Sequence, residues 1–562
     1  MDPQRVDHAT PQLLTTPCRP WPAARPWALC AVAPGCGDAS NSFDSGTAGD
    51  STGTGGPGTT ATDYRGRDTT SSSDGGNGPS LDVGFREDMG GGSKVCTMET
   101  PADIDPRGAV PCNDQAPPNS FDAEVQWSWD GGESYHTPLV INLTDDNGNG
   151  EIDVCDTPDV ILHVGTAAGK IHILDGATGA EHFQLPGNFD PNTTPAVGDI
   201  DDDGLPEIVA SAGLPFAATM VAFEHDGTPK WTSTAPFSAM AGSAIGIANL
   251  DNDGAAEVYV AGVVVRGDTG EAIFTAPPQA GLLAGTLTAP TAADLDGDGT
   301  LEFIRGQDAY HPDGTVYYDD DMVAPGFPQI ANLDDEEDPE VLMISTEGIT
   351  VLEHDGTTKY ANERPSGDPN GFSWFRPATV HDFDGDGISE YAVSSASHYA
   401  AYHRDATVMW IADVQDPSGV AAGTAFDFLG DGTAEAMFAD EYHLFAFDVD
   451  GSAVMTVDRS SGTLIEYPIV ADVDNDGAAE VLVVSNRNFE GEQLTPTLQV
   501  IKDSQDRWIQ ARRIWNQHTY HVTNVNEDGT IPDFEPPHWK LLNTFRTNAQ
   551  IEGGTVCVPP AG

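Results

Sequence analysis

Eight short acidic loops, at a mean spacing of about 47 residues, limit most strongly how this 562-residue chain can fold. Their shared pattern has Asp or Asn at positions 1, 3 and 5, Gly at position 6 and Glu or Asp at position 9. We number them loops 1–8 by their first residues, Asp145, Asp199, Asn249, Asp294, Asn332, Asp382, Asp427 and Asp472. Repeats with a period of roughly 40–50 residues are typical of the blades of a propeller.

The sequence around each loop predicts strands. A short run of small or apolar residues precedes the loop, and a β-rich run follows it, as at residues 207–210 and 480–484. A second apolar run then enters an Asp-Gly turn, for example Asp226-Gly227 or Asp355-Gly356, which is a hairpin signal. Four short strands per unit predict an all-β fold, an eight-bladed β-propeller, with a seven-bladed ring as the alternative if one unit is incomplete.

The loop chemistry points to a hard cation. Carboxylate or amide oxygens at positions 1, 3, 5 and 9, with a backbone carbonyl at position 7, suit Ca²⁺, which takes six to eight oxygen ligands in flexible geometry. Glycine at position 6 allows the tight turn. The predicted ligands are Asp145, Asn147, Asn149 and Asp153; Asp199, Asp201, Asp203 and Glu207; Asn249, Asp251, Asp253 and Glu257; Asp294, Asp296, Asp298 and Glu302; Asp382, Asp384, Asp386 and Glu390; and Asp472, Asp474, Asp476 and Glu480.

Loops 5 and 7 depart from the pattern. Glu337 replaces the turn glycine of loop 5, and Leu429 removes the ligand at position 3 of loop 7. We therefore expect about six Ca²⁺ ions, bound in loops 1–4, 6 and 8. They are expected to be structural, because no loop sequence has an open position beside a base or nucleophile.

The charge balance excludes some classes of partner. Lys and Arg total 24 against 89 Asp and Glu, a formal charge of −65. Such a chain has no electrostatic attraction for nucleic acid or an anionic membrane. No apolar run reaches 18 residues, so a spanning helix is not expected.

The N-terminal composition predicts export. Residues 1–36 combine arginines, a short apolar run and small residues before Cys36, as in a secretory or lipoprotein leader. Residues 37–92 are rich in Gly, Ser, Thr and Asp and predict a disordered tether. A Cys-containing lead-in at 93–122, the propeller at 123–514 and a closing segment at 515–562 follow. Two disulfides are possible among Cys96, Cys112, Cys155 and Cys557, with the pairing open.

The loops, set between strands, resemble the FG-GAP/VCBS repeat family, known from the propellers of integrin α-subunits, in its bacterial exported form. The resemblance covers about residues 138–500. It implies a seven- or eight-bladed propeller, Ca²⁺ in the loops and an adhesive or ligand-binding role at cell surfaces.

Two functional hypotheses remain, beside that of a purely structural spacer. The first is an exported, surface-tethered, calcium-binding propeller that binds a glycan, matrix polymer or protein and has no catalytic residues. The alternative is a polysaccharide-active enzyme, lyase-like, whose charge neutralisation would come from a pocket around Arg512 and Arg513. His518 and His521 are metal-ligand types, but the sequence gives them no carboxylate companion at a clear spacing.

Overall fold

The computed structural model describes residues 110–559 except 167, 215–216, 239–241, 280–288 and 369–370. The chain divides into two units, Met1–Gly90 and Gly91–Gly562, and the described residues belong to the second. The expected leader (1–36), with Cys36, the expected tether (37–92) and Cys96 lie outside the described residues.

The described chain contains eight large sheets, seven of four strands and one of five. The first four, each from its first strand to its last, are sheet 1 with β3 (Leu139–Ile141), β4 (Asp159–Val164), β5 (Lys170–Asp175) and β6 (Glu181–Gln184); sheet 2 with β8 (Ala196–Gly198), β9 (Glu207–Leu214), β10 (Ala217–Phe223) and β11 (Pro229–Thr232); sheet 3 with β12 (Ser243–Ala248), β13 (Glu257–Val260), β14 (Val263–Arg266) and β15 (Ala272–Thr275), to which β7 (Thr193–Thr194) adds a parallel strand; and sheet 4 with β16 (Thr291–Ala293), β17 (Glu302–Ile304), β18 (Asp308–Tyr310) and β19 (Val316–Asp319).

The other four are sheet 5 with β20 (Gly326–Ala331), β21 (Glu340–Ser345), β22 (Gly348–Leu352) and β23 (Thr358–Glu363); sheet 6 with β24 (Thr379–His381), β25 (Glu390–Ser394), β26 (His398–Tyr402) and β27 (Val408–Asp413); sheet 7 with β28 (Gly423–Phe426), β29 (Glu435–Ala439), β30 (His443–Phe447) and β31 (Ala453–Asp458); and sheet 8 with β32 (Ile469–Ala471), β33 (Glu480–Val484), β34 (Leu498–Asp503) and β2 (Ala123–Trp129). Neighbouring strands within each of these meanders are antiparallel. The expectation of an all-β fold is confirmed, since the helices of the described chain are two short 3₁₀ turns, η1 (Gly371–Trp374) and η2 (His538–Lys540).

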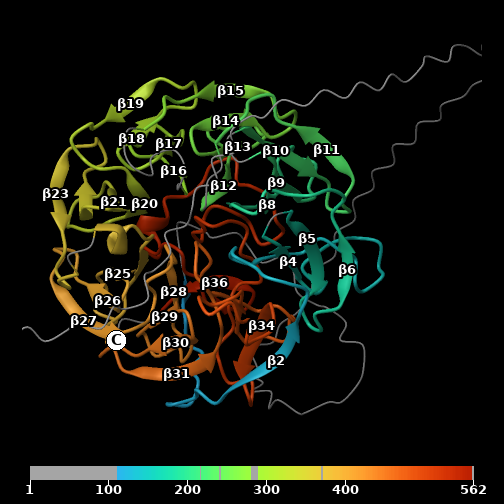
Figure 1. Cartoon of the computed structure of the whole chain (residues 1–562), viewed down its shortest axis with the longest axis vertical. Helices are drawn as coiled ribbons and strands as arrows, with labels where there is room; N and C mark the ends of the chain where they lie inside the picture. The colour runs from blue at the N-terminus through green and yellow to red at the C-terminus, as the bar shows by residue number, and fades with distance from the viewer. Residues whose placement is uncertain are drawn as a thin grey trace, which may run out of the picture. The chain divides into compact units, whose positions relative to one another are not determined.

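The sheets follow one another around a central axis (Figure 1). Their first strands lie toward the axis, and the last strands β6, β11, β15, β19, β23, β27, β31 and β2 form the rim. Sheet 8 joins the two ends of the repeat region, because β2 from its N-terminal end pairs antiparallel with β34 from its C-terminal end. The fold is therefore β-propeller-like.

Aromatic side chains link the rim strands, with the exception of β31, to the next sheet. Trp231 on β11 donates its indole N–H to the carbonyl of Gly267 in sheet 3, at 2.5 Å. A Cβ on Gly270 in the same turn would lie 2.6 Å from the Trp231 ring, and its φ of +69° also favours glycine. Trp127 on β2 makes the corresponding bond to Gly176 of sheet 1, so the joint between sheets 8 and 1 resembles the others.

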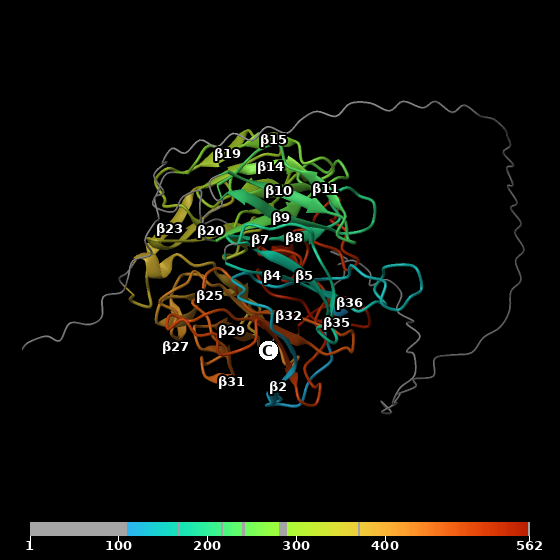
Figure 2. The ribbon, with the colours of Figure 1, turned by 45° about the vertical axis from the view of Figure 1, so that its right-hand side comes forward.

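The residues after β34 form a central segment, 507–550, which contacts the sheets in chain order (Figures 1 and 2), at the innermost strand or, in sheet 4, at Pro290 directly before it. Its contacts with sheets 1 to 8, in that order, are Trp515–Val140, Asn516–Val197, Gln517–Ile247, Thr519–Pro290, His538–Ile330, Phe545–Val380, Arg546–Thr424 and Asn548–Val470. Because sheet 8 ends at Asp503, this segment begins before residue 515, the boundary expected from sequence.

The two ends of the described chain meet in a small sheet. β1 (Val110–Pro111) pairs parallel with β36 (Thr555–Val558), which pairs antiparallel with β35 (Ile551–Glu552). A disulfide joins Cys112 to Cys557, and Cys155 is also disulfide-bonded. Within the described ranges, the structure contains no helix long and apolar enough to cross a bilayer.

Candidate functional site

Loops 2–8 connect the first strand of each sheet to its second. The position-9 glutamate is the first residue of the second strand and pairs with the residue that precedes position 1, as in Gly198↔Glu207 and Ala471↔Glu480. In all seven loops, one oxygen of this glutamate accepts the backbone N–H of position 2, at 2.7–3.1 Å. The glutamate therefore closes the loop. Its other oxygen pairs with Lys230 in loop 2, His311 in loop 4 and Lys359 in loop 5, whereas in loop 8 it has no partner among the described residues.

The position-1 side chain organises the turn. In loops 1, 2, 4, 6, 7 and 8 one oxygen of this aspartate accepts the N–H of the position-6 glycine, at 2.8–3.2 Å. In loop 2, carboxylate oxygens of Asp199, Asp201 and Asp203 lie within 4.8 Å of one another, close enough to share one ion. In loop 3, neither side-chain polar atom of the buried Asn249 has a hydrogen-bond partner among the described residues.

Position 4 is a feature that our sequence reasoning missed. Seven of the eight loops have a left-handed residue there, with φ between +58° and +75°. Only Asp, Asn and Gly occur at these positions, in the residues Gly148, Asp202, Asn252, Gly297, Gly385, Gly430 and Asn475. These residue types tolerate the left-handed conformation best, so the residues at position 4 could have predicted that conformation from the sequence.

Loop 1 has a different register from the one expected. The partner of Ile141, the last residue of β3, is Asp159, which therefore occupies the place of the position-9 glutamates. Asp159 accepts the N–H of Leu143 at 2.8 Å, just as those glutamates accept position 2. The loop of Asp145, Asn147, Asn149 and Asp153 is thus an insertion within a longer connection, although it has the same turn at its tip, where Asp145 accepts the N–H of Gly150.

Loop 5 is rebuilt around its missing glycine. Neither Asp335 nor Glu337 has a positive φ, so Glu337 does not adopt the conformation that glycine adopts at position 6 of the other loops. The side chain of Asn332 instead donates to the carbonyl of Glu336 at 2.6 Å.

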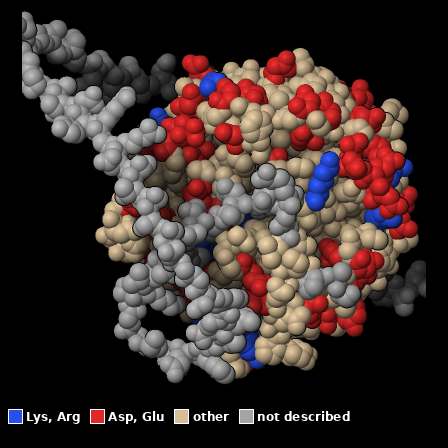
Figure 3. Space-filling model, turned by 180° about the vertical axis from the view of Figure 1, so that it is seen from behind, with Lys and Arg blue, Asp and Glu red and all other residues tan. Residues whose placement is uncertain are grey.

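Because the loop carboxylates are buried, their ionised forms are unfavourable unless a positive charge lies beside them. Burial raises the pKa of Glu207, Glu257 and Glu390 to about 8 in each case. In loop 8, burial and then the charges of Asp474 and Asp476 raise the pKa of Asp472 to about 8. A bound cation would stabilise the ionised forms. Figure 3 shows how strongly Asp and Glu outnumber Lys and Arg on one face.

Two loops contain a cation of their own. The ammonium group of Lys230, on the rim strand β11, lies 2.6 Å from Asp201, 3.0 Å from Glu207 and 3.1 Å from Glu224. Lys359 on β23 pairs in the same way with Asp334 and Glu340 of loop 5, at 2.7 Å from Glu340. Lys230 thus neutralises Asp201 and Glu207, which the sequence assigned to a metal, whereas Lys359 pairs with loop 5, one of the two loops not expected to bind one.

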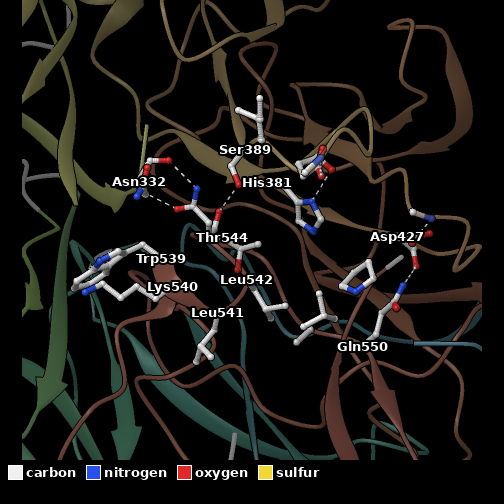
Figure 4. A pocket seen from close by; sticks show the side chains of 18 of the residues that line it. Asn332, His381, Ser389, Asp427, Trp539, Lys540, Leu541, Leu542, Thr544 and Gln550 are labelled. Atoms are coloured by element: carbon white, nitrogen blue, oxygen red, sulfur yellow. Dashed lines mark hydrogen bonds between the residues drawn. The ribbon is translucent and has the colours of Figure 1, made fainter. Parts of the chain in front are cut away.

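A cavity of about 660 Å³ lies where loops 5, 6 and 7 face the central segment (Figure 4). The central segment is fixed there, since Asn543 exchanges two hydrogen bonds with Asn332, at 2.7 and 2.8 Å, and Gln550 donates to Asp427 at 3.1 Å. The polar residues that line the cavity include Asp334, Asp335, Asp382, Asp427, Arg404 and Lys540. The apolar residues that line it include Ile388, Phe426, Trp539, Leu541 and Leu542.

The arginine pair expected to serve an enzyme is not available to a substrate. Arg512 and Arg513 are buried and both bond Glu527, at 2.9 and 3.2 Å. Arg512 also donates to the carbonyls of Val522 and Val525. Because desolvated charges of this kind require internal partners, the pair serves the central segment, and the basic pocket that the enzymatic alternative would have needed around it is not formed.

Comparison with known proteins gives a fold but no family. No family model matches the chain, and no curated protein matches it. Among solved structures, the V. cholerae biofilm matrix protein Bap1 is 20% identical, with a TM-score of 0.67 over 78% of this chain and 100% of that one. Rhamnogalacturonan lyase YesW (16%, TM-score 0.37, 80% and 100%) and the Bacillus licheniformis lyase PL11 (14%, TM-score 0.35, 73% and 97%) are less similar.

Proposed function

We propose that the protein is an exported, surface-tethered β-propeller of eight blades, stabilised by Ca²⁺, that binds a glycan or another matrix polymer without chemical turnover. The eight sheets of similar strand order support the blade number. The likeness to a chain described as a biofilm matrix protein accords with this role. Export, and lipidation at Cys36, rest on the sequence of residues 1–92.

The calcium proposal rests on the loop geometry. In loop 8 the second oxygen of Glu480 has no partner among the described residues, and loop 2 brings three carboxylates within reach of one ion. Lys230 and Lys359 compete for that place in loops 2 and 5. We therefore infer that these two loops bind Ca²⁺ most weakly, although the sequence alone placed loop 2 among the occupied ones.

The cavity carries the ligand-binding proposal. Four aspartates line it, whereas its two lining cations are Lys540 and Arg404, and Arg404 already pairs with Asp335 at 2.8 Å. Carboxylates and amides beside apolar side chains suit the hydroxyl groups and ring faces of a neutral sugar. A polyanion would be repelled, so a neutral glycan is the ligand class that the cavity favours over the acidic substrate of a lyase.

Retention on immobilised polysaccharides tests this proposal. The full chain, in millimolar Ca²⁺, should be retained on a neutral glycan of a panel and should release no unsaturated ends from acidic ones. Ile388 lines the cavity and is 41% exposed, so I388W should obstruct it without disturbing the core. Ile411, 44% exposed on rim strand β27, provides the matched control I411W.

The expected result is that I388W loses retention by at least about tenfold, equivalent to about 1.4 kcal/mol, while I411W binds like the wild type. Equal binding by both variants would move the ligand site away from this cavity. Release of unsaturated products would replace the binding function with the enzymatic one.

A further inference from the structure

Two histidines and a glutamate meet inside the central segment. One ring nitrogen each from His521 and His538, and a carboxylate oxygen of Glu535, lie within 4.8 Å of one another. His521 Nε2 is 2.6 Å from Glu535 Oε1. His521 and His538 are 2% and 0% exposed, and the Glu535 side chain is 6% exposed. The structure thus supplies the carboxylate companion that the sequence did not give to His521.

The outer nitrogen of each ring is fixed by a backbone carbonyl. His521 Nδ1 donates to Thr519 O at 3.1 Å, and His538 Nε2 donates to Ile330 O at 2.9 Å. These bonds determine the tautomers, so the lone pairs of neutral rings are His521 Nε2 and His538 Nδ1. Metal-binding histidines usually donate their other N–H to a carbonyl or carboxylate in this way.

One of the two lone pairs has no hydrogen-bond partner. His538 Nδ1 is buried and receives no hydrogen bond from any described residue. Aromatic rings enclose the group, with Phe545 stacked on His521 at 5.3 Å and Trp539 edge-on to His538 at 5.2 Å. An unpartnered acceptor in such a dry site costs free energy unless it binds something.

We propose that His521, Glu535 and His538 bind a first-row transition-metal dication, most simply Zn²⁺. Two imidazole nitrogens and one carboxylate oxygen form a ligand set that Zn²⁺ accepts, whereas Ca²⁺ takes oxygen ligands. This site is therefore chemically distinct from the acidic loops. It does not depend on the proposed glycan binding.

The position of the site suggests what the metal does. Residues 515–519 contact sheets 1–4, and residues 538–548 contact sheets 5–8. The ligands lie at the two ends of the stretch that links these halves. Through His538 the metal is also coupled to Ile330 of β20. A metal here would hold the two halves of the central segment in one conformation.

Metal analysis of the full chain tests the proposal. The protein is stripped with chelator, dialysed against Zn²⁺ in excess Ca²⁺ to saturate the loops, and washed. We expect about one Zn²⁺ per chain in the wild type and less than about a tenth of that in H538Q. His518 is equally buried and donates to the carbonyl of Ile465, so H518Q, outside the ligand set, should retain the metal.

A second measurement avoids the risk that H538Q misfolds. Co²⁺ bound by the wild type should give visible ligand-field absorption that Zn²⁺ abolishes by displacement, whereas Ca²⁺ should leave it unchanged. Absence of both zinc and cobalt binding by the folded wild type would overturn the proposal, as would zinc retention by a folded H538Q. His521 and Glu535 would then form a hydrogen-bonded ion pair alone.

Discussion

Replacing Lys230 with methionine is expected to make the stability of the protein depend more strongly on Ca²⁺. The substitution keeps the length of the side chain but removes its charge from three carboxylates of loop 2 and its hairpin, Asp201, Glu207 and Glu224. In the wild type the ammonium group neutralises them and repels a second cation. In K230M a Ca²⁺ ion can take this role, because the same oxygens remain in place.

The size of the effect follows from burial. Breaking a fully buried ion pair costs about 3–5 kcal/mol, and partial exposure of Asp201 and Glu224 reduces this to about 1–3 kcal/mol. Ca²⁺ at 100 times the Kd of a new site stabilises the folded state by about 2.7 kcal/mol. The loss seen in chelator should therefore be largely recovered in Ca²⁺.

Thermal unfolding and ion counting of the full-length protein measure this change. K230M should melt below the wild type in chelator, approach it in millimolar Ca²⁺, and bind about one more ion per chain. In the control K170M the lost ammonium group bonds the carbonyl of Gly187 and no carboxylate among the described residues, so any shift should be the same in both conditions. If K230M is equally destabilised with and without Ca²⁺ and binds no additional ion, the idea that lysine and calcium compete in loop 2 is wrong.

Replacing Glu527 with glutamine leaves two buried arginines without their counter-charge and should cost about 3–5 kcal/mol at pH 7. Burial alone would raise the pKa of Glu527, but the two arginines lower it overall, so the stabilisation by this carboxylate is lost on acidification. The difference in the free energy of unfolding between the wild type and E527Q, measured in urea, should therefore narrow as the pH falls below 4.5. A constant difference would contradict this. Reducing the Cys112–Cys557 disulfide, of sequence separation 445, should lower the melting temperature, since loop entropy predicts about 6 kcal/mol; unchanged melting would refute it. G270A should lower the melting temperature more than G553A, because both sites have positive φ but only the first has a tryptophan ring in the way; equal shifts would refute the packing argument.

The acidic loops and the all-β fold were predictable because both are local in sequence. Loop positions lie within nine residues of one another, and each aspartate at position 1 bonds a glycine five residues later. The strand runs follow directly. Relations between residues that lie close together in the sequence therefore predict the repeating unit, including the turn at position 6.

Features that depend on distant contacts were not predictable in this way. Lys230 is 29 residues from Asp201, and only the pairing of β10 with β9 and β11 brings it back to the loop. The register of loop 1 was hidden by an insertion that itself imitates the pattern. Glu535 reaches His521 through an irregular stretch, for which neither the 3.6-residue nor the two-residue period gives guidance.

The path of the central segment has a consequence for how the chain is made. Residues 515–548 are synthesised after the repeat region, and they contain hydrogen-bond partners for the innermost strand of each sheet or, in sheet 4, for Pro290 directly before it. Backbone and side-chain groups on those inner edges therefore lack these partners until residues 515–548 have been made. A chain that stops or is cut before residue 515 therefore loses a partner in every sheet at once, and no contiguous part of the repeat region is spared.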